Sequence, residues 1–197
     1  TKKQDMEKSL KGTKTEQNLL KSFAGESQAR NRYTYFASVA KKEGYEQISA
    51  IFTETADNEK EHAKRFFKFL EGGDLEITAT YPAGKIGTTL ENLQAAAAGE
   101  NEEHTILYPE FAKVAEQEGF DEIASVYKFI STVEAEHERR YLALAANVKN
   151  AKVFKKDSSI KWRCRNCGYV YNSAEAVDLC PACAHPKAYQ EVAADNY

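Results

Sequence analysis

Cysteine is absent from most of this 197-residue chain, because all four cysteines lie between Cys164 and Cys183. A secreted protein stabilised by disulfides would spread its cysteines along the whole chain. Long apolar runs are also missing, and none approaches the roughly 18 residues that a membrane-spanning helix needs. The first residues, TKKQDMEKSLKGTKTEQ, lack the apolar stretch of a secretory signal. We therefore expect a soluble, cytoplasmic protein with no membrane partner.

A strong charge of one sign is missing too. The 27 basic and 30 acidic residues leave a formal net charge of -3. Nucleic-acid binding usually needs a clustered basic surface, so this balance argues against a nucleic-acid partner.

Glycine and proline are sparse between residues 13 and 150, where the chain reads as helix nearly throughout. Gly44 and Gly119 each divide a long periodic run in two. The segment 71–89, EGGDLEITATYPAGKIGTT, is too long for a hairpin turn and suits a crossover between two helix pairs. This pattern predicts a four-helix bundle with one long crossover, the connection of ferritin-like bundles.

Apolar residues at i, i+3 and i+4 form a stripe on each predicted helix, and carboxylates or histidines interrupt every stripe near its middle. The interrupting residues are Glu26, Glu59, His62, Glu100, Glu103, Glu134 and His137. Burying an unpaired carboxylate costs roughly several kcal/mol even after the protein relaxes. Five carboxylates that converge in one core therefore favour bound cations, which would remove this cost. Oxygen and imidazole ligands without thiolate suit iron or manganese, with zinc an alternative.

The two helix pairs resemble copies of each other. Tyr33 and Tyr108, like Glu59 and Glu134, are 75 residues apart, whereas Glu26 and Glu100 are 74 apart. One residue has therefore been added between Glu100 and Tyr108. An extra residue inside a helix is accommodated as a π-bulge, so we predict one in the third helix.

Each of two helices carries a Glu-x-x-His motif, Glu59/His62 and Glu134/His137, whose side chains share one helix face. Together with a glutamate from each remaining helix, these motifs are typical of di-iron and di-manganese bundles.

Several neighbouring residues have less specific expectations. Tyr33 and Tyr108 either donate hydrogen bonds to metal-bound carboxylates or pack as ordinary core residues. We expect His104 and His185 at the surface. The glutamates off the stripe are expected to be solvated; they are Glu61, Glu136 and Glu138.

The four cysteines form two knuckles, Cys164-x-x-Cys167 and Cys180-x-x-Cys183. This spacing predicts one tetrahedral thiolate site but leaves zinc and iron both open. Aromatic and β-branched residues around it favour short strands, with Trp162, Tyr169 and Tyr171 about the knuckles. We therefore expect a helical bundle over residues 1–150, a polar flexible linker over 151–160 and a small β-rich metal domain over 161–197.

The combined motifs resemble those of the rubrerythrin family over essentially the whole chain. The stretches that carry the resemblance are FAGESQARNRY, ETADNEKEHAKRFFKFLEGGDLEI, AAGENEE, VEAEHE and KWRCRNCGYVY with LCPACAHPKA. The resemblance implies a mainly α, ferritin-like bundle followed by a rubredoxin-like domain. It also implies three irons per chain, two in the bundle and one on the four cysteines.

The resemblance implies a role for each ligand in turn. Glu59 and Glu134 resemble the carboxylates that bridge the two irons. Glu26 and Glu103 would hold the first iron. On reduction that iron would exchange Glu103 for His62, as in the family. The second iron would be held by Glu100 and His137, and Tyr33 and Tyr108 match the family's tyrosines beside the ligands.

The resemblance further implies a non-haem di-iron peroxidase that reduces hydrogen peroxide to water in defence against oxidative stress. Glu103, His62, Tyr33 and Tyr108 would be its catalytic residues. Electrons would come from NADH through a reductase or a rubredoxin and pass through the thiolate-bound iron. They would cross between subunits of a homodimer or higher homo-oligomer. The rival interpretations are iron oxidation and storage, a di-iron oxygenase, and a zinc-ribbon interaction module on a structural bundle.

Overall fold

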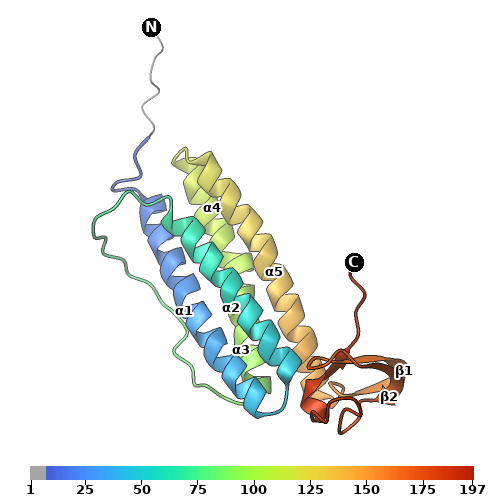
Figure 1. Ribbon diagram of the computed structural model, residues 1–197. Helices are drawn as coiled ribbons and strands as arrows, with labels where there is room; N and C mark the ends of the chain where they lie inside the picture. Colours follow the sequence, from blue (N-terminus) through green and yellow to red (C-terminus); the bar gives the residue numbers. More distant parts are fainter. Residues whose placement is uncertain (1–7) are drawn as a thin grey trace.

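The structure is a computed structural model that describes residues 8–197. Figure 1 shows a long bundle of helices with a small β-rich unit at one end. None of the helices in the described part of the chain combines the length and the apolar character needed to cross a membrane.

The first helix pair consists of α1 (Lys14–Lys42) and α2 (Glu46–Phe67). The side chain of Thr13 accepts a hydrogen bond from the Glu16 amide and caps the start of α1. Gly44 lies between the two helices with φ of +86°, a conformation that costs a side-chain-bearing residue energy. The expected break at Gly44 is therefore a tight turn that makes α1 and α2 antiparallel neighbours.

A crossover without regular secondary structure then runs along the outside of the bundle to α3 (Thr89–Glu102) (Figure 1). Thr88 and Glu91 form a capping box, in which each side chain bonds to the other residue's backbone amide. This cap explains why the crossover ends there.

The third helix of the bundle has three sections. A π-helical turn, η1 (Glu103–Leu107), joins α3 to α4 (Tyr108–Gln117) without a break in the chain's helical course. The predicted π-bulge between Glu100 and Tyr108 is confirmed. The last helix, α5 (Asp121–Lys149), follows a turn at Gly119, where φ is +75°.

Two apolar clusters fill the bundle, one towards each end. Phe36, Phe52 and Leu93 belong to one cluster, and Leu19, Phe66 and Tyr127 to the other. In α1, α2 and α5, the predicted metal ligands lie in the stretch of sequence between the residues of these two clusters. The polar site is thus sealed by apolar packing on both sides along the bundle axis.

The C-terminal unit is a three-stranded antiparallel sheet in the order β2-β1-β3. Its elements are β1 (Lys155–Cys164), β2 (Val170–Glu175), the short helix η2 (Lys187–Tyr189) and β3 (Gln190–Val192). Trp162 is fully buried there, and its indole N–H donates to the Ser173 carbonyl at 2.9 Å.

The segment 151–160 differs from the expected flexible linker. Six of its ten residues belong to β1, and the Phe154 carbonyl accepts a hydrogen bond from the Ala176 amide at 2.8 Å. The Phe154 ring also stacks on Tyr45, with ring centroids 6.0 Å apart. The polar composition concealed this strand because most of its side chains face solvent, while backbone pairing holds it. The sheet unit is consequently docked on the α1–α2 end of the bundle.

Candidate metal centre

One glutamate from each of four helical segments points into the middle of the bundle. Glu26 comes from α1, Glu59 from α2, Glu100 from α3 and Glu134 from α5. Their exposed fractions are 0 to 1%. Burial of four carboxylates at this level is rare in proteins unless the charges are paired or bind metal.

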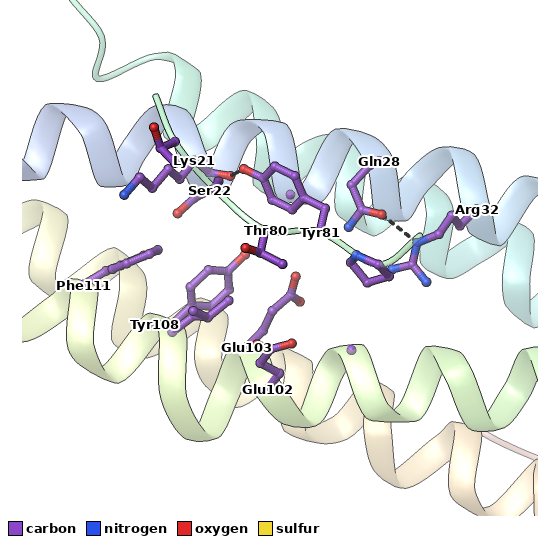
Figure 2. A pocket seen from close by; sticks show the side chains of 16 residues that line it. Lys21, Ser22, Gln28, Arg32, Thr80, Tyr81, Glu102, Glu103, Tyr108 and Phe111 are labelled. Carbon is purple, nitrogen blue, oxygen red and sulfur yellow. Dashed lines mark hydrogen bonds between the residues drawn. The ribbon is translucent and has the colours of Figure 1, made fainter. Parts of the chain in front are cut away.

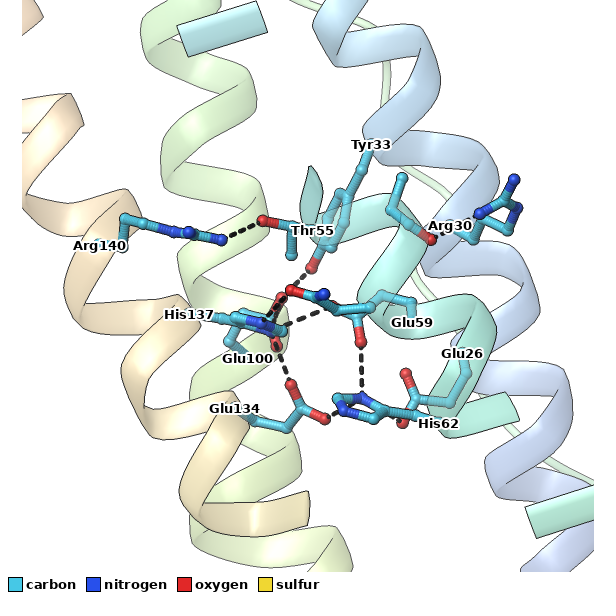
Figure 3. A network of polar contacts seen from close by, with 12 residues as sticks. Glu26, Arg30, Tyr33, Thr55, Glu59, His62, Glu100, Glu134, His137 and Arg140 are labelled. Carbon is cyan, nitrogen blue, oxygen red and sulfur yellow. Dashed lines mark hydrogen bonds and ion pairs between the residues drawn. The ribbon is translucent and has the colours of Figure 1, made fainter. Parts of the chain in front are cut away.

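The first group of converging ligand atoms comprises Glu26, Glu59, His62 and Glu134, all within 4.8 Å of one another. Nδ1 of His62 lies 2.9 Å from an oxygen of Glu59 and 2.9 Å from an oxygen of Glu134. It is 3.8 Å from Glu26. Figure 3 shows His62 at one side of this cluster, pointing towards Glu134 and Glu59.

The second group comprises Glu59, Glu100, Glu134 and His137, again within 4.8 Å. Nδ1 of His137 lies 3.1 Å from Glu59 and 2.9 Å from Glu134. Glu59 and Glu134 therefore belong to both groups, as carboxylates that bridge two ions would.

Buried polar atoms that lack a hydrogen-bond partner indicate whether these residues suit a metal ion. Among the described residues these buried atoms include Oε2 of Glu26, Oε1 of Glu59, Oε2 of Glu100, both oxygens of Glu134 and Nδ1 of His137. The atoms lie close together, yet their geometry is not that of hydrogen bonds. Two imidazoles supply too few donors for these converging carboxylate lone pairs, and cations would stabilise the remainder, so the residues fit two metal ions.

Electrostatics in the metal-free cluster point the same way. Burial, and then the neighbouring carboxylates, raise the pKa of Glu26, Glu100 and Glu103 well above the ordinary value. Burial opposes ionisation of Glu59 as well, but the close imidazoles of His137 and His62 hold its pKa down at about 2. The cluster thus binds protons where it would otherwise bind metal.

Two tyrosines contact the ligands from opposite sides. The Tyr33 hydroxyl donates to Glu100 at 2.5 Å, and the Tyr108 hydroxyl donates to Glu26. Of the two alternatives left open for these tyrosines, the hydrogen-bonding one holds. Both rings are also buried among aromatic neighbours, so each tyrosine packs and donates at once.

Sequence reasoning missed Asn58. Its side-chain oxygen lies 3.3 Å from Nε2 of His137, which leaves Nδ1 of His137 free to face the carboxylates. A partner of this kind fixes the tautomer and ring orientation of a metal-binding histidine. The only signal in the sequence was its position beside Glu59, and asparagine is too common on helices for that to be informative.

Glu103 is the one predicted bundle ligand that lies outside both groups. It is only partly buried and lines a cavity of about 350 Å³ together with Tyr108. Figure 2 shows the two side chains below the crossover residues Thr80 and Tyr81. The structure therefore places His62 with Glu26, and Glu103 towards the cavity.

The expectations that His104 and Glu138 are fully solvated were wrong. His104 and Glu138 are only about a fifth exposed, and Nε2 of His104 lies 2.5 Å from a carboxylate oxygen of Glu138. His104 lies in the π-turn and reaches Glu138 of α5 from there. His185 keeps part of its surface exposed, packs edge-on against Tyr189, and is not among the ligand atoms that converge at the cysteine site. Glu61 and Glu136 are exposed as expected.

The four cysteines converge on a second centre. Their sulfur atoms lie within 4.8 Å of one another, with Cys164 and Cys183 at 3.8 Å and Cys167 and Cys180 at 3.7 Å. A tetrahedron with metal–sulfur bonds of about 2.3 Å has sulfur–sulfur edges of about 3.8 Å. All four are free thiols, so the geometry fits one tetrahedral metal ion.

Comparison with known proteins covers nearly the whole chain. A sequence model of the rubrerythrin family matches residues 17–145, and one of the rubredoxin-like domain of rubrerythrins matches residues 162–191. Rubrerythrin of Porphyromonas gingivalis is 68% identical over 100% of this chain and 98% of its own length. Rubrerythrin of Nitratidesulfovibrio vulgaris is 59% identical over 96% of this chain and all of its own.

Solved structures agree with the sequence comparison. The structure of fully reduced nigerythrin superimposes with a TM-score of 0.62 at 30% identity, covering 96% of this chain and 91% of the other. A bacterioferritin from Desulfovibrio desulfuricans, at 24% identity and a TM-score of 0.61, shares the fold of the bundle.

Proposed function

The chain belongs to the rubrerythrin family, with a di-iron site in the bundle and a third iron on the four cysteines, and from that premise we propose that it reduces hydrogen peroxide to water. The reaction belongs to defence against oxidative stress. NADH supplies the electrons through a reductase or a rubredoxin. They then pass through the thiolate-bound iron to the di-iron site.

The observation that carries the proposal is the arrangement of His62 and Glu103. His62 faces Glu26, Glu59 and Glu134 at the site, whereas Glu103 faces the cavity. With Glu103 lining the cavity, a small ligand that enters the cavity would come within reach of the site. The same two side chains are those that the family resemblance gives as alternative ligands of the first iron.

When bound, two ferrous ions supply the two electrons that cleave the O–O bond. The chain's own residues position the site and manage the protons. Burial, and then the charge of Glu100, raise the pKa of Glu103 well above the ordinary value, which favours the protonated form of this carboxyl beside the cavity. A proton donor at that position can protonate a leaving water.

Tyr33 and Tyr108 hold further protons. Burial, with Glu100 beside Tyr33 and Glu103 beside Tyr108, raises the pKa of both phenols well above the ordinary value. Both therefore remain protonated, and each hydrogen bond orients a ligand, Glu100 or Glu26.

The position of the small domain supports a role for a second copy of the chain. Tyr45, the N-cap of α2, and Glu59 within that helix are separated by about 21 Å at 1.5 Å per residue. Because the sheet unit packs at the Tyr45 end, its cysteines lie far from the di-iron site of the same chain. We therefore propose a homodimer, in which the small domain of one copy serves the di-iron site of the other.

The test uses the colour of the thiolate-bound iron. The protein is reduced anaerobically, freed of reductant and mixed with one equivalent of hydrogen peroxide in a stopped-flow instrument. We expect the ferric colour to return rapidly, far faster than with dioxygen. Glu59→Ala should abolish the rapid phase, whereas Glu61→Ala, an exposed residue on the same helix, should retain it.

Two results would contradict the proposal. A colour that returns no faster with peroxide than with dioxygen would favour iron oxidation and storage, and uptake of many irons per chain would then be expected. A rapid phase that survives Glu59→Ala would mean that peroxide reacts away from the di-iron site.

A further inference from the structure

The cavity beside Glu103 is much larger than hydrogen peroxide requires. Its volume is about 350 Å³, within the range of roughly 300–1,000 Å³ typical of pockets for small organic ligands. A molecule close to water in size occupies only about 30 Å³. The cavity has room for a compact organic substituent as well as a peroxide group.

The crossover forms the outer wall of this cavity. Thr80 and Tyr81 lie over the gap between α1 and the π-turn (Figure 2). The Tyr81 hydroxyl donates to the Lys21 carbonyl of α1 at 2.6 Å, which ties the crossover to the bundle. Gly25 of α1 faces the Tyr81 ring, where a Cβ would lie 3.5 Å from Cε1. The wall is therefore held by a hydrogen bond and by packing.

The inner wall changes from polar to apolar along one helix. Glu103 lies at the polar end, beside Tyr108, whose hydroxyl bonds to the ligand Glu26. Leu107 and Phe111 line the cavity beyond them, across from Lys21 and Ser22 of α1 (Figure 2). Residues four apart lie on one helix face, so a carboxylate is followed there by two apolar side chains. This order matches a molecule with a peroxide group at one end and an apolar substituent at the other.

We propose that the cavity binds organic hydroperoxides with a compact apolar substituent, such as cumene hydroperoxide, and presents their O–O bond to the di-iron site. This rests on the proposed peroxide reduction and extends it to a second substrate class. In the reaction the O–O bond breaks, two electrons come from the reduced di-iron site and two protons come from solvent through the site. The products are the corresponding alcohol and water.

The test variant is Thr80→Phe, which places a ring in the cavity from an exposed residue of the crossover. Its matched control is Ala83→Phe, which adds the same ring three residues further on, at an exposed position that does not line the cavity. Neither residue is a ligand or a proton donor. The holoenzyme is reduced as above and its reoxidation is followed with cumene hydroperoxide and, separately, with hydrogen peroxide.

We expect Thr80→Phe to lower the second-order rate for cumene hydroperoxide by about tenfold or more, the scale of discrimination in an apolar pocket. The rate for hydrogen peroxide should change by no more than about twofold, because a small molecule needs little of the volume. Ala83→Phe should leave both rates unchanged. A second readout is calorimetric binding of the product, cumyl alcohol, to the oxidised protein, which Thr80→Phe should abolish and Ala83→Phe should retain.

Failure of this inference is distinct from failure of the proposed function. If hydrogen peroxide reoxidises the protein but cumene hydroperoxide does not, the cavity proposal alone is overturned. It is also overturned if Thr80→Phe slows both substrates equally, or slows neither. If cumene hydroperoxide reacts and hydrogen peroxide does not, the proposed function alone fails, and if neither reacts, both fail.

Discussion

Removal of the metal ions should make the bundle progressively less stable as pH rises above neutrality. Without metal, burial lowers the pKa of His62, but hydrogen bonds to Glu134 and Glu59 outweigh it and raise the value to about 10. His137 behaves in the same way, with a pKa raised to about 12. Both exceed the value of about 6.5 for an unfolded chain.

The sign follows from proton binding. A histidine with a raised pKa in the folded state stabilises it fully below pH 6.5, and this stabilisation is lost as pH rises towards the folded value. One pH unit corresponds to about 1.4 kcal/mol per group. As pH rises from 6.5 to 8.5, the stabilisation from His62 and that from His137 each fall by up to about 3 kcal/mol. The free energy of unfolding falls by the same amounts.

Three of the buried carboxylates have a pH dependence of the same sign. Burial raises the pKa of Glu26, Glu100 and Glu103, so their contribution is also present at low pH and lost as pH rises. Glu59 has a pKa lowered to about 2, so it contributes above pH 4.5 and loses that contribution only in acid. It therefore does not change the sign between pH 6.5 and 8.5.

The assay is urea unfolding followed by helical circular dichroism, because nearly all helix lies in the bundle. Protein stripped of metal should be several kcal/mol less stable at pH 8.5 than at 6.5. His62→Gln should remove about half of this difference, and Glu61→Gln, an exposed control, should leave it unchanged. With metal bound the histidines are neutral ligands, so the loss should disappear. Metal-free protein that is equally or more stable at pH 8.5 would refute the reasoning.

Three further predictions concern single side chains. Tyr108→Phe should lower the free energy of unfolding by about 1–3 kcal/mol, because a buried Glu26 oxygen loses its donor; calorimetry should show no such loss for the half-exposed Tyr35→Phe. Phe52→Ala should cost about 3–5 kcal/mol in urea unfolding, because it empties a fully buried site, whereas Phe67→Ala, at 55% exposure, should cost under half of that. Cys180→Ser should remove the visible absorption of the thiolate-bound iron and leave the unfolding of the bundle unchanged, since that site lies in the sheet unit; retained absorption would contradict the four-thiolate assignment.

Much of the metal centre followed from periodicity within single helices. Glu59 and His62 share a helix face because they are three residues apart, and the same holds for Glu134 and His137. The apolar stripes also indicated that the ligands are buried, since the residues on either side of each interruption are core residues. Six of the seven predicted bundle ligands meet in two groups for this reason.

The π-turn was predictable for a different reason. Two helix pairs of similar sequence provide an internal standard, and the spacing of 74 residues against 75 located one added residue. The sequence did not indicate what the turn does to its neighbours. His104 and Glu138 were expected in water, yet His104 reaches Glu138 of α5 from the π-turn.

What the sequence by itself determined is the set of residues that lie on each helix face and on each cysteine knuckle, because those relations depend only on local geometry. Tertiary structure decided the contacts between segments: Glu103 towards the cavity, Asn58 on His137, and the strand within 151–160. It also decided the cavity itself, which exists because the crossover lies across the π-turn. Such contacts depend on how helices rotate and where a loop crosses them, and no periodicity within one segment encodes either.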